Sequence, residues 1–269
     1  MVKYWITDCI LAPCRFSTLI NCPEATPEAL ASLKSLNYGG GSISLATLQR
    51  TQERYKHVRI DTGYVMSESG PITFNLTNKN ISSAGSPAPG TKVRIVNEDG
   101  KNLTFNEVGE ILAYTGRPWK GYYGNPEETH RIQDAEGWFH TGDLGYFNEE
   151  NNLYLVDRIR EALKYQGLQY TPGEIEDVIM ELLQVQDVCV VGVYNERAGD
   201  EAGALVVVNE GSFISEKEIV DHVAKRISAV QKQLRLGVQF TEKLPVNVNG
   251  KKIRIAAREE FLKKKAEAK

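Results

Sequence analysis

The sequence has 269 residues, of which 41% are hydrophobic and 25% charged, and its formal net charge at pH 7 is −3. These values are typical of one or two ordinary globular domains, and the weak negative charge argues against a nucleic-acid-binding surface. No apolar run approaches the roughly 20 residues that a membrane-spanning helix needs, and Lys3, Asp8 and Arg15 interrupt any apolar core of a secretory signal.

The four cysteines do not indicate a metal site. Cys9, Cys14, Cys22 and Cys189 lack the paired C-x-x-C spacing of zinc ligands, so we interpret them as reduced thiols of an intracellular protein. The final residues, 267–269, read E-A-K and do not match the S-K-L type of peroxisomal signal. We therefore expect a cytoplasmic or peroxisomal protein, with no nucleic-acid partner and no membrane span.

The first 60 residues alternate between strand-like and helix-like patterns. Residues 2–20 mix the two, and residues 23–36 are predicted to form a helix with Thr26 as its cap. A glycine-rich turn then leads into a second helical pattern over residues 45–57. Its members, Gly40, Gly41 and Ser42, offer bare backbone that a flat or charged ligand can approach closely. A plain strand-to-helix turn is the alternative.

A short strand is predicted at residues 58–60, and D-T-G-Y-V-M-S-E-S follows it at residues 61–69. The ring of Tyr64 can stack on a purine, the hydroxyl of Ser67 can bond a phosphate, and the carboxylate of Glu68 can hold magnesium. A polar loop without a ligand is the alternative. Farther on, I-S-S-A-G-S-P-A-P-G-T-K looks like a phosphate loop, but its prolines favour a connector.

Short β-type runs follow, at residues 92–96, 110–114 and 153–156, and predict a small barrel or sheet. Asp143 is expected in a glycine turn within this part. Its two carboxylate oxygens can accept both hydroxyls of a ribose, although an ordinary solvated turn acid is also compatible with the pattern.

Beyond a charged junction at residues 157–161, helices and strands alternate again. Two capping boxes predict helices, one from Thr171 and Glu174 to about residue 185 and one from Ser215 and Glu218 to about residue 234. The continuous apolar runs at residues 188–193, 204–208 and 238–240 are typical of buried strands, and a helix closes the chain. This part predicts a small α+β domain with its own core.

Several motifs together resemble one known family. The order T-G-D-x-x-Y, V-D-R and a lysine shortly before G-x-Q is similar to that of the acyl-adenylate-forming enzymes, which include acyl-CoA synthetases, 4-coumarate–CoA ligases and luciferases. The residues that carry it are Thr141, Gly142, Asp143, Tyr146, Val156, Asp157, Arg158, Lys164, Gly167 and Gln169. Residues 116–129 and 134–143 also match, and the resemblance covers about the C-terminal half of a usual member.

The resemblance implies an α/β plus α+β fold: the C-terminal part of the large adenylate-forming domain, followed by a small mobile α+β domain. Its segments are a partial α/β portion at 1–84, a small β-barrel-like subdomain at 85–157, a hinge at 158–160 and the C-terminal domain at 161–269. The implied reaction is ATP-dependent activation of a carboxylic acid, fatty or aryl, to acyl-AMP, followed by transfer to coenzyme A. ATP or AMP, Mg²⁺ and coenzyme A are the implied cofactors and partners.

The resemblance also implies roles for individual residues. Nucleotide binding falls to Gly40, Gly41, Ser42, Gly63, Tyr64, Ser67, Asp143 and Arg158, and metal binding to Glu68. Val65 and Met66 are expected at the acyl pocket, and Arg160 is the expected hinge residue. Three residues depart from the family pattern: Ser42 replaces a proline, Val65 a glycine and Gln166 a lysine.

Two lysines are the implied catalytic residues. Lys251 follows the tight-turn pair Asn249-Gly250 and is expected to neutralise charge during adenylation; the match favours it over the adjacent Lys252. Lys164, with Gly167 and Gln169, is expected at the thioester step once the hinge has rotated.

The serine- and glycine-rich phosphate loop that usually lies upstream is not part of these 269 residues. We therefore expect that this polypeptide does not complete the reaction alone. The alternative is a non-catalytic remnant that binds a nucleotide or a partner.

Overall fold

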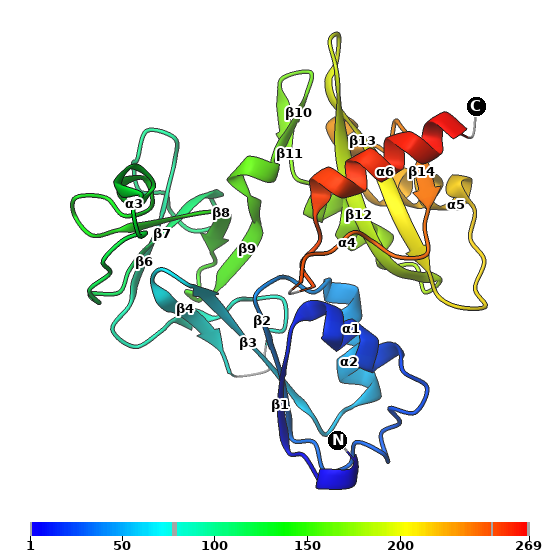
Figure 1. Ribbon diagram of the computed structural model, residues 1–269, viewed down its shortest axis with the longest axis horizontal. Helices are drawn as coiled ribbons and strands as arrows, with labels where there is room; N and C mark the ends of the chain where they lie inside the picture. Colours follow the sequence, from blue (N-terminus) through cyan, green and yellow to red (C-terminus); the bar gives the residue numbers. More distant parts are fainter. Residues whose placement is uncertain (1, 77–79, 249, 268–269) are drawn as a thin grey trace. The chain divides into compact units, whose positions relative to one another are not determined.

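The computed structural model describes residues 2–76, 80–248 and 250–267. The chain divides into two compact units, Met1–Arg160 and Glu161–Lys269. Each unit has a hydrophobic core of its own. In Figure 1 the first unit runs from blue to green and the second from green to red.

The first unit begins with a mixed five-stranded sheet. Strands β1, β2 and β3 are parallel, and β4 and β5 continue the sheet in antiparallel pairing. Helices α1 and α2 connect the parallel strands and pack against them in one core. The elements are η1 (Val2–Tyr4), β1 (Asp8–Leu11), α1 (Pro13–Asn21), β2 (Ser35–Gly39), α2 (Leu45–Arg54), β3 (Arg59–Met66), β4 (Gly70–Asn75) and β5 (Ser86–Pro87). Because the parallel strands end at one edge, the segments after β2 and β3 meet there.

The helix predicted over residues 23–36 is wrong: this segment forms successive turns and then enters β2. Thr26 does start one turn, since its hydroxyl oxygen accepts from the amide of Ala29 at 3.1 Å. Leu30 and Leu33 are then buried in the core. Tertiary packing of these leucines therefore outweighs local helix propensity.

A four-stranded antiparallel sheet completes the first unit, in the order β6-β7-β8-β9. Its elements are β6 (Lys92–Val96), β7 (Gly109–Tyr114), α3 (Pro126–Ile132), β8 (Phe139–Phe147) and β9 (Leu153–Arg158). The sequence analysis missed β8, and Asp143 lies within this strand rather than in a turn. Gly142, at φ +68°, and a bulge between Leu144 and Gly145 let the strand continue through a glycine-rich sequence.

The second unit is a sheet covered on both faces. Its elements are β10 (Leu163–Tyr165), β11 (Leu168–Tyr170), α4 (Pro172–Ile179), β12 (Val185–Asn195), β13 (Gly199–Val208), α5 (Glu216–Arg226), η3 (Val230–Lys232), β14 (Val238–Phe240) and α6 (Arg254–Glu267), with η2 (Ile159–Glu161) before them. Along β12, Val188 and Val190 face α4 and α5, while Cys189 and Val191 face α6. Burial on both faces explains the continuous apolar runs in the sequence.

Both predicted capping boxes form, but the helices that they open end earlier than predicted. Helix α4 ends at Ile179 rather than near residue 185, because Val185 already pairs with Val208 in the sheet. Helix α5 ends at Arg226 rather than near residue 234. Leu234, which extends the helical pattern, is buried in the same core from the irregular segment after η3 instead.

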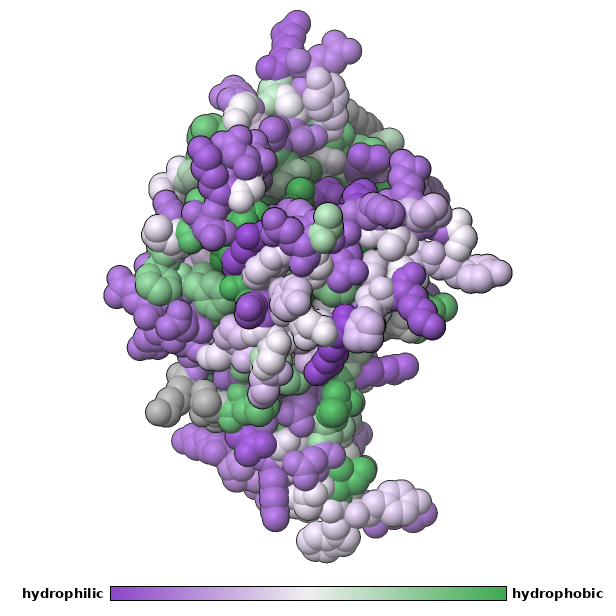
Figure 2. Space-filling model, turned by 90° about the vertical axis from the view of Figure 1, so that its left-hand side faces the viewer, coloured by the Kyte–Doolittle hydropathy of each residue, from purple (hydrophilic) through white to green (hydrophobic). Residues whose placement is uncertain are grey.

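Within the described residues, no helix has both the length and the apolar character that crossing a membrane requires. Figure 2 shows one face of the molecule, on which hydrophilic side chains predominate and apolar ones form small groups between them. Scattered apolar groups of this kind are normal on a folded protein.

Candidate active site

Three of the predicted nucleotide-binding residues lie together in the first unit. The hydroxyl of Tyr64, near the end of β3, donates to Oδ2 of Asp143 at 2.6 Å. Nε of Arg158 lies 3.4 Å from Oδ1 of the same carboxylate, and the two residues are register partners in β8 and β9. Arg158 and Asp143 thus form an ion pair across the two strands.

The surroundings keep Tyr64 protonated and Asp143 accessible. Burial, and next the negative charge of Asp143, raise the pKa of Tyr64 above its ordinary value. The side chain of Asp143 is 19% exposed and that of Arg158 is 38% exposed. Each carboxylate oxygen has two lone pairs, so Asp143 retains acceptor capacity toward solvent while Tyr64 and Arg158 fix its orientation.

The glycine-rich turn lies at the same sheet edge as Tyr64. Gly39, the last residue of β2, is the register partner of Gly63 in β3, and the turn follows directly. Gly40 has φ +81°, which favours glycine. A Cβ on Gly41 would lie 3.3 Å from a ring carbon of Pro13. The turn is thus tightly packed at Gly41, and it leads through Ser42 to α2.

The predicted strand at residues 58–60 extends farther, since β3 runs to Met66, so the segment from Val65 to Glu68 is a strand end and a turn rather than the polar loop that was the alternative. A bulge between Tyr64 and Val65 shifts the pairing of β3 with β4. Val65 is 47% exposed, and Met66 ends the strand. Ser67 and Glu68 form the turn that follows.

The carboxylate of Glu68 accepts a hydrogen bond from the hydroxyl of Tyr122, a residue that the sequence analysis did not single out. This bond is the main cause that raises the pKa of Tyr122 to about 12. The ring of Trp119 supports that of Tyr122 at 5.2 Å. Both aromatic residues belong to segment 116–129, whose match to the family could have pointed to them from the sequence. Among the described residues no group of three or more potential His, Cys, Asp or Glu ligands surrounds a metal position.

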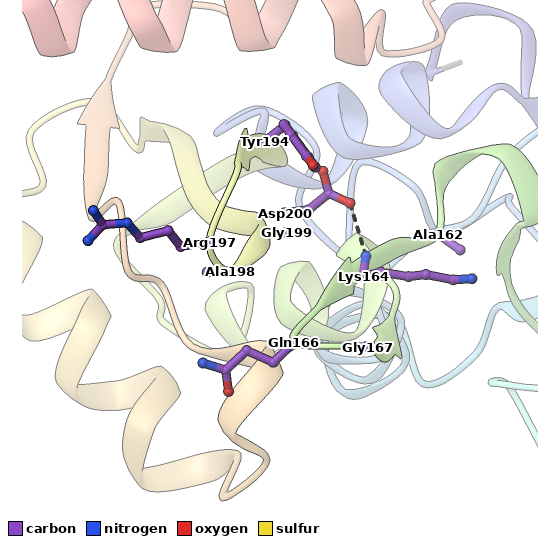
Figure 3. A pocket seen from close by; sticks show the side chains of 9 residues that line it. All are labelled: Ala162, Lys164, Gln166, Gly167, Tyr194, Arg197, Ala198, Gly199 and Asp200. Atoms are coloured by element: carbon purple, nitrogen blue, oxygen red, sulfur yellow. Dashed lines mark hydrogen bonds between the residues drawn. The ribbon is translucent and has the colours of Figure 1, made fainter.

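In the second unit, Lys164 and Gln169 face each other across a tight hairpin. They are register partners in β10 and β11, and the turn between them is Gln166-Gly167. Both turn residues have positive φ, +49° and +78°, as in a type I′ turn. The hairpin borders an open hollow of about 550 Å³ (Figure 3). Its lining residues are Ala162, Lys164, Gln166, Gly167, Tyr194, Arg197, Ala198, Gly199 and Asp200.

The structure distinguishes the two adjacent lysines near the C-terminus. Lys251 is exposed, and its amide donates to Oδ1 of Asn247 at 2.9 Å. Nζ of Lys252 instead lies 2.6 Å from Oδ1 of Asp187 and 2.7 Å from the carbonyl oxygen of Val188. Lys252 is therefore tied to strand β12, whereas Lys251 is exposed. The predicted turn pair includes Asn249, which lies outside the described residues.

Arg160, the predicted hinge residue, is exposed and belongs to η2. The division between the two units falls directly after it. Tyr64, Asp143 and Arg158 belong to the first unit, and Lys164 and Lys251 to the second. The roles of all these residues remain predictions.

Comparisons with known proteins agree on one family. Residues 1–123 match the AMP-binding enzyme family and residues 174–251 the AMP-binding enzyme C-terminal domain. The luciferin 4-monooxygenase of Nipponoluciola cruciata is 34% identical over 251 residues, which are 92% of this chain and 46% of that protein. The 4-coumarate–CoA ligase-like 9 of Oryza sativa subsp. japonica is 33% identical over 98% of this chain and 49% of its own. The chain thus spans about half the length of these curated relatives.

Solved structures agree as well. ATP-bound MatB from Rhodopseudomonas palustris has a TM-score of 0.88 at 25% identity, over 97% of this chain and 52% of its own. The amide bond synthetase McbA from Marinactinospora thermotolerans has a TM-score of 0.86 at 26% identity, over 97% and 54%. These matches confirm the predicted fold class and the resemblance, and the chain belongs to the AMP-binding, acyl-adenylate-forming enzyme family.

Proposed function

We propose that this chain binds ATP and AMP and supplies the C-terminal part of an ATP-dependent ligase that forms an acyl-AMP and then an acyl-CoA. The observation that carries the proposal is the group of Tyr64, Asp143 and Arg158 beside the glycine-rich turn. Relatives named as a luciferin 4-monooxygenase and a 4-coumarate–CoA ligase-like protein, and a structural neighbour solved with ATP, support it.

The first unit has the chemistry that a nucleoside requires. The carboxylate of Asp143 accepts both ribose hydroxyls, and the guanidinium of Arg158 offsets negative charge beside them. The ring of Tyr64 offers a face to the purine, and the backbone of Gly40, Gly41 and Ser42 lies along the adenine and ribose. Gly63 keeps β3 free of a side chain next to Tyr64.

Magnesium would reach this site with the nucleotide. Glu68 contributes one carboxylate, and Ser67 a hydroxyl for a phosphate oxygen. Mg²⁺ commonly binds through one or two carboxylates together with substrate phosphates. That mode fits a site where no group of three protein ligands is found among the described residues.

In the first half-reaction a carboxylate oxygen of the acid bonds to the α-phosphorus of ATP, and pyrophosphate leaves. Lys251 neutralises the charge that develops there, an effect worth about 3–4 kcal/mol for such a group. In the second, the thiol of coenzyme A attacks the acyl carbon and AMP leaves. Lys164, Gly167 and Gln169 act in this step after rotation at Arg160. The acid is fatty or aryl, and Val65 and Met66 border its pocket.

The nucleotide step is tested first, by calorimetry and thermal shift of the 269-residue chain with AMP and ATP. We expect binding of both, and a loss of at least tenfold in affinity, about 1.4 kcal/mol, in Asp143→Ala. Asp99→Ala changes an exposed turn carboxylate of the same unit and serves as the control. The absence of heat and of a thermal shift with either nucleotide would exclude the proposal.

The complete reaction is tested separately, because the chain spans about half the length of its relatives. The chain is incubated with ATP, Mg²⁺, coenzyme A and a panel of fatty and aryl acids, and products are identified by mass spectrometry. In a completed enzyme, Lys251→Ala is expected to lose acyl-AMP formation while it retains thioester formation from supplied acyl-AMP. Equal loss of both steps contradicts the assigned role. Nucleotide binding without either product indicates that the chain alone does not complete the reaction, and it fits the second candidate, a non-catalytic nucleotide-binding remnant.

A further inference from the structure

The loop that carries Lys251 is held at its base by two cations that point inward. Lys252 binds Asp187 and the carbonyl oxygen of Val188 in β12. Arg254, two residues on, begins α6 and is also half-buried. The amide of Ile253 between them closes the loop on the carbonyl oxygen of Pro245 at 2.9 Å. The half-buried Lys252 and Arg254 thus alternate with the exposed Lys251 and Ile253.

Arg254 joins three segments that are far apart in the sequence. Its Nη1 lies 2.5 Å from Oε1 of Glu176 in α4 and 2.5 Å from the carbonyl oxygen of Val190 in β12. Its Nε lies 3.0 Å from Oε2 of Glu161, the first residue of the second unit. The exposed fractions of the three charged side chains are 21% for Arg254, 15% for Glu176 and 24% for Glu161. One guanidinium therefore connects the start of the unit with the end of the Lys251 loop.

The pKa shifts of Arg254 and Glu176 both favour the charged forms of these side chains. Burial opposes the positive charge of Arg254, but Glu176, Cys189 and Glu161 together outweigh that effect and raise the pKa of the guanidinium. For Glu176, burial opposes the charge too, and Arg254 followed by Lys252 lowers its pKa on balance. A buried ion pair adds little net stability, because removing the two charges from water costs about as much as their attraction gains. We therefore interpret the pair as one that fixes the positions of the segments it joins.

We propose that Arg254 is a positioning residue: it fixes the Lys251 loop to Glu161, so that the loop and the start of the second unit move as one body. This inference rests on the proposed function insofar as Lys251 serves adenylation. The planar guanidinium binds two carboxylates and a carbonyl in fixed directions, which the single ammonium of lysine does not reproduce. Arg254→Lys therefore keeps the positive charge but loses the fixed directions of these three contacts.

The first test measures amide hydrogen exchange on the full 269-residue chain. The probes are the amides of Gly250 and Lys251 in the loop and of Lys164 near Glu161, each of which donates a hydrogen bond. We expect Arg254→Lys to accelerate exchange at least tenfold in peptides covering residues 250–253 and 161–164, with the β12 and β13 core unchanged. Arg226→Met, which breaks an exposed ion pair with Glu181, is the matched control and leaves both peptides unchanged.

Two results overturn the inference: wild-type protection in both peptides, or equal acceleration in β12 and β13, which marks a purely structural residue. Glu161→Gln offers a milder variant if Arg254→Lys fails to fold, and it is expected to accelerate the same two peptides.

The second test follows the half-reactions. Arg254→Lys is expected to lower kcat of adenylation at least tenfold with little change in KM for ATP, while thioester formation from supplied acyl-AMP persists. A change in KM alone contradicts a positioning role. If the wild type forms no acyl-AMP by itself, as expected for a chain that supplies only part of the ligase, the exchange experiment alone decides the role of Arg254; failure of the proposed function is read instead from the absence of nucleotide binding.

Discussion

The hydroxyl of Tyr64 donates to the carboxylate of Asp143 at 2.6 Å, across a sequence separation of 79 residues. Tyr64 belongs to the α/β sheet and Asp143 to the antiparallel sheet, so this bond connects the two sheets of the first unit. The candidate nucleotide site is therefore assembled from both sheets, and its geometry depends on how firmly they are joined. Because the carboxylate is charged, the bond is stronger than one between neutral groups.

The first prediction concerns that bond. Tyr64→Phe removes the donor and leaves Asp143 with Arg158 alone, so the free energy of unfolding of the first unit falls by about 1–2 kcal/mol. Chemical denaturation measures the change. Tyr123→Phe is the control, because Tyr123 is fully exposed, and it is expected to be neutral. Unchanged stability of Tyr64→Phe would mean that the bond does not connect the sheets in solution.

A second prediction concerns acid sensitivity of the second unit. The side chain of Glu176 is 15% exposed. Burial opposes its charge, but Arg254 and Lys252 together outweigh that effect, so its folded-state pKa lies below the ordinary value of 4.5. The unfolded chain then binds more protons than the folded one, so Glu176 stabilises the fold above pH 4.5, and this stabilisation is lost as the pH falls through the folded-state pKa.

Glu176→Gln removes this contribution and leaves Arg254 partly unpaired. At pH 7 the variant is expected to lose about 3 kcal/mol of unfolding free energy, and below pH 4 the difference from wild type narrows. Urea titrations at several pH values measure both effects. A difference that stays constant from neutral to acid pH would show that folding does not change the pKa of Glu176.

The sequence predicted most elements of this fold because their signals are local. The capping boxes at Thr171 and Ser215 place two helix starts, and the apolar runs of β12 and β13 place two strands. Helix ends were less predictable. At Val185 and Leu234 the apolar pattern continues past the end of a helix. Tertiary packing alone decides that Val185 enters the core from a strand and Leu234 from an irregular segment.

The candidate site was predictable in its residues but not in its contacts. The motif around Asp143 drew attention to it, yet the glycines that made a turn plausible belong to a bulged strand. The partner of Glu68 was missed, because 54 residues separate it from Tyr122 and no periodic pattern links the two. The same holds for Arg254, whose partner Glu161 lies 93 residues away.

A third prediction concerns cysteine reactivity. Cys189 is fully buried between β12 and α6, and burial, with the charge of Glu176 next, raises its pKa to about 12. Because the thiolate is the reactive form, alkylation of Cys189 at pH 7.5 is expected to require opening of the unit. Iodoacetamide labelling, followed by peptide mapping, compares it with the half-buried Cys9. Labelling of Cys189 at the rate of Cys9 in the native protein would contradict the burial described above.

The last prediction concerns the hairpin assigned to the thioester step. Gln166 occupies a left-handed conformation at φ +49°, which most L-residues adopt only at a cost, whereas asparagine tolerates it well. Gln166→Asn is therefore expected to raise the unfolding free energy of the second unit by about 0.5–1 kcal/mol. Gly167, at φ +78°, has no atom within 4 Å of a Cβ built on it, so Gly167→Ala tests backbone strain alone and is expected to destabilise by about 1 kcal/mol. Opposite signs for the two variants in thermal denaturation support the type I′ turn, and equal signs reject it. Because this turn sets the register that places Lys164 opposite Gln169, its conformation determines which groups the proposed coenzyme A thiol would meet.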